Sequence, residues 1–166
     1  MKTRQTLTIL LLAAAATLRA APPAEIVLPA DAKSPIADGV ALPAGRALFW
    51  TSGTVPTPLN KDGKTIDERY GDTYTQGVSA LKNIEQVLAA QGLSLKDVVY
   101  LRVYVAADVA KEGKPDFAGW FKAYGEFFNN GKNPGKTARS TVGVAALVSP
   151  DWLIEIEAFA VYPAAK

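Results

Sequence analysis

Two segments near the C-terminus decide the fold: KTARSTVGV at positions 136–144 and LIEIEAFA at positions 153–160. Polar and apolar residues alternate in both, which is typical of a half-buried β-strand, because successive side chains of a strand point to opposite faces. Together the two segments place Arg139, Glu155 and Glu157 on strand faces. The whole chain contains no histidine and no cysteine, so its chemistry has to depend on arginine, glutamate, serine and backbone groups.

The clearest strand precedes these segments and covers Asp97 to Ala106 (DVVYLRVYVA). Its valines and leucine would form one face and its tyrosines and arginine the other. A further strand is expected at Ala47–Ser52 (ALFWTS). The turn PAGR before that strand would join it to Gly39–Leu42 as a β-hairpin.

Two helices are expected between the strands. The first would be capped by Asp72 or Thr73 and would end at Gln91-Gly92, with apolar residues spaced three and four positions apart. The second would begin near Pro115 and end before the turn at positions 129–131. Its aromatic residues share one helical face that we expect to lie in the core: Phe117, Trp120, Phe121, Tyr124, Phe127 and Phe128.

The element order β-β-α-β-α-β-β predicts an α+β sandwich, in which two helices cover one face of a mixed sheet. The second face of that sheet would carry Trp50, Tyr100, Tyr104 and Phe159. Because a large open apolar surface marks an interaction site, we expect other subunits to pack on this face.

The N-terminus has the layout of a secretory signal peptide at residues 1–21, with cleavage after Ala20 as the favoured site. Basic residues come first (MKTR), an apolar run follows, and small residues precede the proline pair at 22–23. An uncleaved anchor is the alternative. The remaining chain would comprise an extended arm at residues 22–38 and a single domain at residues 39–166. Export of this kind predicts a periplasmic protein.

Removal of the leader changes the charge balance. The chain has 18 Lys and Arg against 16 Asp and Glu, and three of the basic residues (Lys2, Arg4 and Arg19) lie in the leader, which leaves 15 against 16. A nearly neutral chain gives no electrostatic reason to expect a nucleic-acid partner or, after cleavage, a membrane partner. Without cysteine, the exported domain has to be stabilised by its core or by oligomerisation.

Several ordered blocks carry a family resemblance. They are TSG at 51–53, LKNI at 81–84, AAQGLSL at 89–95, DVV at 97–99, Tyr124 with FF at 127–128, ARSTV at 138–142 and IEIEA at 154–158. With these blocks the chain resembles the RidA/YjgF family, also called the endoribonuclease L-PSP family, from about Ser34 to Val161. The resemblance implies a chorismate-mutase-like fold and a homotrimer with clefts between subunits. It also implies hydrolysis of reactive 2-imino or enamine acids to 2-keto acids and ammonia, without a cofactor.

The resemblance assigns roles to individual residues. Arg139 corresponds to the arginine that binds the substrate carboxylate, and Glu155 to the carboxylate that positions water or moves a proton. Ser52 and Gly53 match the loop that lines the cleft, and with Thr141, which lies in the matched block with Arg139, they are expected to bind the substrate. The chemistry suits these roles, because a planar guanidinium forms paired hydrogen bonds to a planar carboxylate and a glutamate can act as a general base.

Two departures from the family predict a more apolar cleft: Ile36 stands where the family often has a tyrosine, and Phe121 where it commonly has an asparagine. They support an alternative function, a non-catalytic protein that binds a small carboxylate metabolite on the same trimer. A nuclease is disfavoured by the near-neutral charge and by the lack of histidine. Ser52 lacks a histidine base, which excludes a serine hydrolase. Acidic residues at metal-ligand spacing are absent from the sequence, so no metal is expected.

Overall fold

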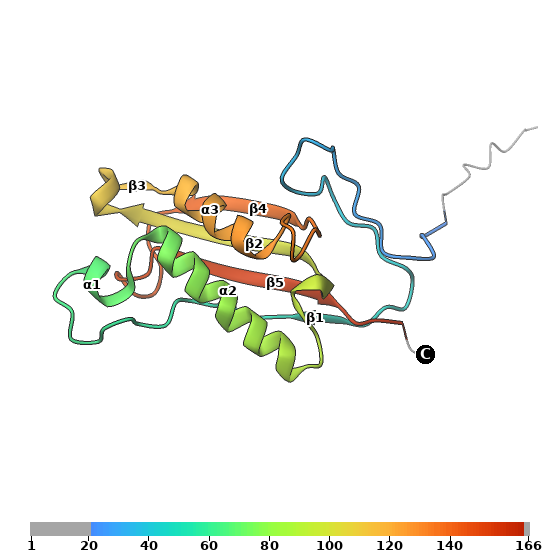
Figure 1. Ribbon diagram of the computed structural model, residues 1–166, viewed down its shortest axis with the longest axis horizontal. Coiled ribbons are helices and arrows are strands. Elements are labelled where there is room, and N and C mark those ends of the chain that lie inside the picture. The colour runs from blue at the N-terminus through green and yellow to red at the C-terminus, as the bar shows by residue number, and fades with distance from the viewer. Residues whose placement is uncertain (1–20, 165–166) are drawn as a thin grey trace, which may run out of the picture.

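A computed structural model, which describes residues 21–164, shows a mixed sheet with helices on one side (Figure 1). The strands are β1 (Leu48–Trp50), β2 (Val98–Asp108), β3 (Lys114–Pro115), β4 (Ala138–Val144) and β5 (Ile154–Val161). β5 lies between β1 and β2 and is antiparallel to both, whereas β4 pairs with β2 in parallel. The short β3 pairs with the end of β2. The predicted α+β sandwich with a mixed sheet is therefore confirmed.

The helices are α1 (Ile66–Tyr70), α2 (Thr73–Ala90) and α3 (Phe117–Phe127), with short 3₁₀ turns at Leu95–Asp97 and Val109–Lys111. Asp72 caps α2 by accepting a hydrogen bond from the Thr75 amide, as predicted. Asp116 caps α3 in the same way through the Gly119 amide. Pro115, near which the sequence predicted the helix to begin, therefore precedes the helix and lies in β3.

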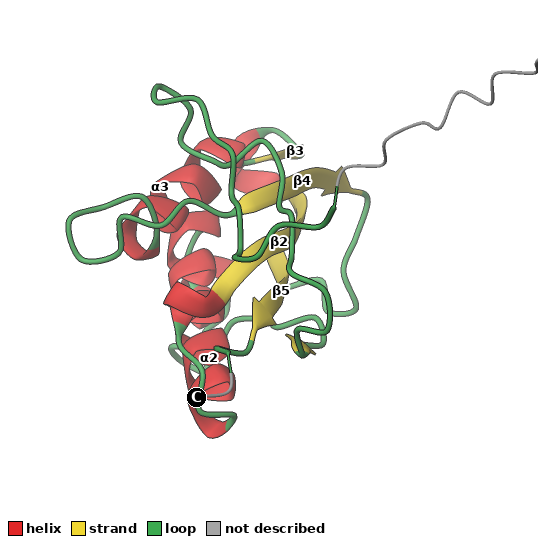
Figure 2. Ribbon diagram, turned by 90° about the vertical axis from the view of Figure 1, so that its right-hand side faces the viewer, coloured by secondary structure: helices red, strands yellow, loops and turns green. Residues whose placement is uncertain are grey.

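The hydrophobic core lies between α2, α3 and the sheet. Leu101, Val103 and Val105 of β2 are completely buried there, together with Ile154 and Ile156 of β5. Figure 2 shows the helices on one side of the strands, so the opposite side of the sheet is left open. No helix in the described part of the chain is long and apolar enough to cross a membrane. The predicted signal peptide lies outside the described residues, apart from residue 21.

The predicted β-hairpin between Gly39–Leu42 and Ala47–Ser52 is wrong. Ala41 instead bridges Val27 within the N-terminal arm, and β1 pairs with β5. The pairing with β5 sets Trp50 opposite Phe159, with ring centroids 4.8 Å apart. Cross-strand aromatic pairs of this kind stabilise a sheet, and the short segment at residues 39–42 offers no comparable partner.

The aromatic face of α3 is only partly in the core, contrary to the sequence prediction. Trp120, Tyr124 and Phe128 are buried, but Phe117 and Phe121 are 38% and 48% exposed. One stripe of a helix can face the core, and in α3 the residues Trp120, Ala123 and Tyr124 take that stripe. Phe117 and Phe121 lie at the border of that stripe, beside Gly143 and Arg139 of β4, and are partly open to solvent.

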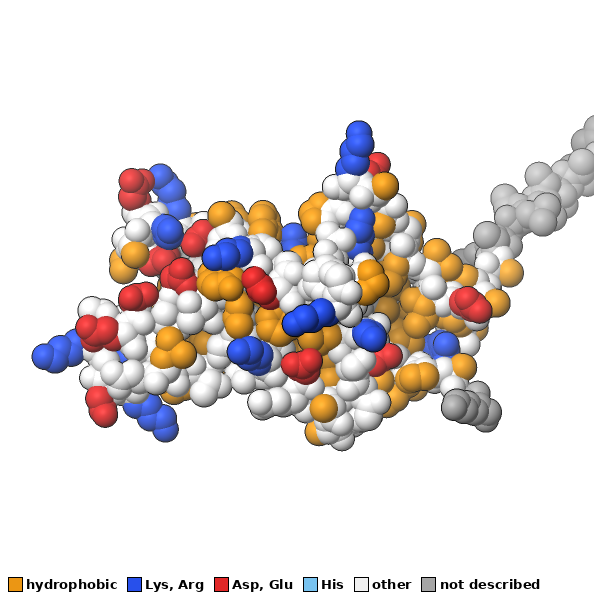
Figure 3. Space-filling view, viewed as in Figure 1, with side chains coloured by type: hydrophobic (Ala, Val, Ile, Leu, Met, Phe, Trp, Pro, Cys, Tyr) orange, Lys and Arg blue, Asp and Glu red, His pale blue; other side chains and the backbone are white. Residues whose placement is uncertain are grey.

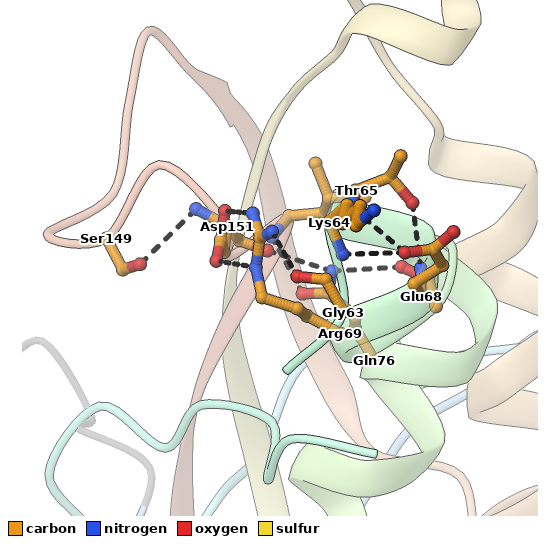
Figure 4. A network of polar contacts seen from close by, with 10 residues as sticks. Gly63, Lys64, Thr65, Glu68, Arg69, Gln76, Ser149 and Asp151 are labelled. Atoms are coloured by element: carbon orange, nitrogen blue, oxygen red, sulfur yellow. Dashed lines mark hydrogen bonds and ion pairs between the residues drawn. The ribbon is translucent and has the colours of Figure 1, made fainter. Parts of the chain in front are cut away.

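A polar network fixes the long loop between β1 and α2 against the loop that leads into β5 (Figure 4). Arg69 donates two hydrogen bonds of 2.6 Å to the Asp151 carboxylate and a third to the Gly63 carbonyl oxygen. Gln76 donates to the Asp151 carbonyl oxygen and accepts from the Leu153 amide. The Arg69 pair holds the pKa of the Asp151 carboxyl below its usual value. The start of β5, and with it Glu155, is thereby fixed in position.

Candidate active site

Arg139 lies on β4 and faces the helices. It is level with the buried Leu101 of β2, and its guanidinium carbon lies 5.5, 4.8 and 4.5 Å from the ring centres of Trp120, Phe121 and Tyr124. These three rings form an aromatic cage, in which cation–π attraction holds the charged group. Burial lowers the pKa of the Arg139 guanidinium, and its Nη1 atom is buried without a hydrogen-bond partner in the described part of the chain. A cation in such surroundings is stabilised by an anionic ligand.

The neighbours of Arg139 on and before β4 orient the cage. The Trp120 indole nitrogen donates to the Thr141 hydroxyl at 3.2 Å. The Thr137 amide donates to the Tyr124 hydroxyl, also at 3.2 Å. Thr141, which the sequence predicted to bind substrate, therefore lies beside Arg139 and supports the cage through Trp120. Trp120, Tyr124 and Thr137 were not predicted as site residues, although the spacing of the two aromatic residues, four positions apart, places them on one side of a helix.

The N-terminal arm runs along the outer edge of β4. The Ala37 amide donates to the Thr137 carbonyl oxygen at 3.0 Å, and Ala37 forms a parallel bridge with Ala138. The arm and the start of β4 enclose a cavity of about 430 Å³, which is lined by both Ile36 and Arg139. Of the predicted residues, Phe121 therefore contacts the Arg139 cation directly, Thr141 lies beside it on the same strand, and Ile36 lines a cavity that Arg139 also lines.

Glu155 lies on the open face of the sheet. It is opposite Tyr104 of β2 and lines a cavity of about 490 Å³ with the loop that follows β4. The loop after β1 runs directly over its carboxyl group, because a Cβ atom on Gly53 would lie only 2.7 Å from the Glu155 Cδ. Ser52 is the exposed neighbour in the same loop. The structure thus brings together three of the predicted site residues, Glu155, Ser52 and Gly53.

Glu157, on the same face, is fully engaged. It accepts hydrogen bonds of 3.1 Å from the Arg102 guanidinium and from the Tyr104 hydroxyl. Within residues 21–164, the Glu155 carboxylate accepts no hydrogen bond of this kind. Of the two glutamates, Glu155 is the one available for a reactant.

The two groups form half-sites on opposite faces of one sheet. Arg139 faces the helices, whereas Glu155 faces away from them. A single chain therefore does not bring the predicted pair together. In residues 21–164 no three His, Asp or Glu side chains are grouped so that they could hold a metal ion.

The protein is an α+β protein that presents a caged arginine on one face of its sheet and a separate glutamate half-site on the other. Comparison with known proteins gives the family. The family model described as Endoribonuclease L-PSP matches residues 35–162. The chain belongs to this family, which is the RidA/YjgF family that its sequence blocks resemble.

Individual relatives agree with this assignment. A RutC family protein of Pyrococcus horikoshii is 36% identical over 82% of this chain and 96% of its own length. The 3-aminoacrylate deaminase RutC of Acinetobacter baylyi is 32% identical over 83% of this chain and 98% of its own length. Among solved structures, the YjgF gene product of E. coli has a TM-score of 0.55 at 31% identity, covering 80% of this chain and 91% of that one.

Proposed function

We propose that the protein hydrolyses 2-imino or enamine acids to 2-keto acids and ammonia. The observation that carries this proposal is the Arg139 guanidinium, which is held in an aromatic cage without a carboxylate from residues 21–164 beside it. The similarity to a protein named 3-aminoacrylate deaminase supports it. The half-site around Glu155 supplies the second group that the reaction needs.

The reaction requires little of the protein, because an imine is intrinsically reactive toward water. Arg139 binds the substrate carboxylate through paired hydrogen bonds and so fixes the position of the C=N carbon. Glu155 accepts a proton from the attacking water as the C–O bond forms, and returns a proton to nitrogen. The hydroxyl proton of the resulting carbinolamine then passes to nitrogen as the C–N bond breaks, and the keto acid and ammonia leave. The sum is R–C(=NH)–COO⁻ plus H₂O giving R–CO–COO⁻ plus NH₃.

The proposed cleft lies between subunits of a homotrimer. Arg139 and Glu155 face opposite sides of one sheet, so a complete site takes Arg139 from one subunit and Glu155 from its neighbour. Trp50, which is 63% exposed, and Phe159 provide apolar contact area on the open face for such packing.

The first test is ammonia release from imino acids that an amino-acid oxidase generates in situ. Arg139→Ala should lose the acceleration, whereas Lys82→Ala, which removes a positive charge from the exposed side of α2, should keep it. Arg139→Lys keeps the charge but loses the planar fork, so its activity should be intermediate. Full activity of the Arg139→Ala protein would refute the proposal.

A complementation test addresses the location of the cleft. Arg139→Ala and Glu155→Gln should each be inactive alone. After unfolding and refolding together in equal amounts, about a quarter of the clefts should hold both native residues, because each head-to-tail interface joins one residue from each neighbour. Recovery of activity in the mixture places the site between subunits, and no recovery from correctly refolded protein contradicts that location.

A non-catalytic binding protein is the second candidate, favoured by Ile36 and Phe121, which make the surroundings of Arg139 apolar. Saturable, Arg139-dependent binding of 2-keto acids without turnover of any imine would establish it.

We also propose, from residues 1–21, that the protein is exported to the periplasm. Fractionation of cells that express the full chain, with an immunoblot for the size of the product, tests this.

A further inference from the structure

The aromatic cage around Arg139 continues along α3 as an aromatic wall, which consists of Phe121 and Phe117. The Phe117 ring lies one helical turn before Phe121, with the two ring centres 6.5 Å apart and the planes 20° from parallel. The Phe121 ring is in turn 4.8 Å from the Arg139 guanidinium carbon. A continuous line therefore runs from the cation across Phe121 to Phe117.

The rings of this wall are partly exposed, and they are not needed to complete the hydrophobic core. Phe117 and Phe121 are 38% and 48% exposed, while the core stripe of α3 is filled by other residues. Contact of neighbouring aromatic rings with water is unfavourable in free energy compared with their burial, so such rings favour a ligand or partner that covers them. Figure 3 shows hydrophobic side chains gathered over α3 and β4 at this edge of the molecule.

The far end of the wall is held in place by β4. At Gly143 the backbone approaches the wall closely, since a Cβ atom there would lie 3.5 Å from Phe117 Cζ and 3.0 Å from Pro115 Cγ. Arg139, Thr141 and Gly143 alternate along the helix-facing side of the strand, so the strand that positions the cation also supports the wall. The cation and the rings therefore keep a fixed relation to each other.

We propose that the preferred substrate is a 2-imino acid with an aromatic side chain. The inference rests on the proposed deaminase function and names its substrate class. The substrate carboxylate binds Arg139, and the aromatic side chain lies along Phe121 toward Phe117, where offset or edge-to-face ring contacts form. The C=N carbon remains outside the cage, facing the neighbouring subunit that brings Glu155. Water adds to the carbon of R–C(=NH)–COO⁻, and ammonia leaves, whatever the group R.

The test compares imines made in situ from phenylalanine, leucine and alanine, using the full-length protein. We expect kcat/KM for the phenylalanine-derived imine to exceed that for the alanine-derived imine by about tenfold or more, since apolar pockets discriminate by at least this factor per buried group. Phe121→Ala and Phe117→Ala should each reduce this ratio by about fivefold. Val87→Ala, which removes an exposed apolar side chain from α2, should leave the ratio unchanged.

The outcomes separate this inference from the proposed function. Arg139-dependent turnover with equal or better rates for the alanine-derived imine overturns the aromatic preference and leaves the deaminase in place. A ratio that survives Phe121→Ala and Phe117→Ala also overturns it. If no imine is turned over, the deaminase fails, and binding of phenylpyruvate against pyruvate by calorimetry decides the inference alone. Tighter, Phe121-dependent binding of phenylpyruvate supports the aromatic site, and equal binding overturns it.

Discussion

Replacement of Gly53 by alanine tests whether the position of the Glu155 carboxylate matters. A Cβ atom at residue 53 would overlap the Glu155 Oε1 atom and lie 2.7 Å from its Cδ and 3.0 Å from its Cγ. Carbon atoms in contact are about 3.5–4.0 Å apart, so the carboxyl group has to retreat by about 1 Å. Only a flexible side chain on the open face has to move, and the backbone can stay where it is.

The expected result is a loss of activity without a loss of stability. A displacement of about 1 Å at a reacting group can cost a factor of about 100 in rate, so kcat/KM for imine hydrolysis should fall by about 100-fold. The free energy of unfolding should stay within about 1 kcal/mol of the wild type, because alanine also reduces the conformational entropy of the unfolded chain. Steady-state ammonia release and urea denaturation measure the two quantities.

The matched control is Gly131→Ala. Gly131 also lies in a loop, but a Cβ atom there would have no heavy atom within 4 Å, so both activity and stability should be unaffected. Retention of full activity by Gly53→Ala, alongside inactivity of Glu155→Gln, would refute the argument that the loop after β1 fixes the carboxylate. A large fall in stability would refute the argument that only the side chain yields.

Three further predictions concern the fold and its assembly. Leu101→Ala, at a completely buried position, should lower the free energy of unfolding by about 2–5 kcal/mol in urea denaturation; a loss below about 1 kcal/mol would contradict the tight core. Asp151 has a folded-state pKa below its ordinary 3.8, first because of the hydrogen bonds from Arg69, so its contribution to stability is present above that pH and is lost as the pH falls through the folded pKa. Asp151→Asn should accordingly lose less stability than the wild type between about pH 5 and pH 2, measured by thermal unfolding. Equal pH dependence of stability in the variant and the wild type would argue against a stabilising Arg69–Asp151 pair. Trp50→Asp should convert the proposed trimer to smaller species in analytical ultracentrifugation, because it introduces a charge on the exposed aromatic surface, and an intact trimer would show that subunits do not pack there.

The sequence predicted the parts of the fold that local patterns control. The strands β2, β4 and β5 follow from alternation of side chains, and α2 follows from its cap at Asp72 and its apolar spacing. The partner of β1 could not be predicted in the same way. Its pairing with β5 depends on a contact between Trp50 and Phe159, which are more than a hundred residues apart in the chain.

The candidate site was predictable residue by residue but not as an arrangement. Arg139 and Glu155 were identified through matching blocks, yet the face that each side chain occupies depends on the register of its strand against β2. The aromatic cage could not be predicted, because the spacing of Trp120 and Tyr124 is that of ordinary core residues in an amphipathic helix. The exposure of Phe117 was missed for the same reason: a helical stripe shows which residues share a face, but not how far the neighbouring elements cover it.

The opposite orientation of Arg139 and Glu155 links activity to assembly. In a sheet, side chains on one face cannot reach the other face by changing rotamer, because the backbone and its hydrogen-bonded neighbours lie between them. The proposed site therefore needs a second chain, and the free energy for bringing that chain into place has to come from surfaces outside the site. The open face, with Phe159 and the 63% exposed Trp50, offers an aromatic surface that could supply it. A substitution at Trp50 should thus reduce imine hydrolysis in parallel with the population of the proposed trimer, although Trp50 pairs with Phe159 and lies outside the proposed site.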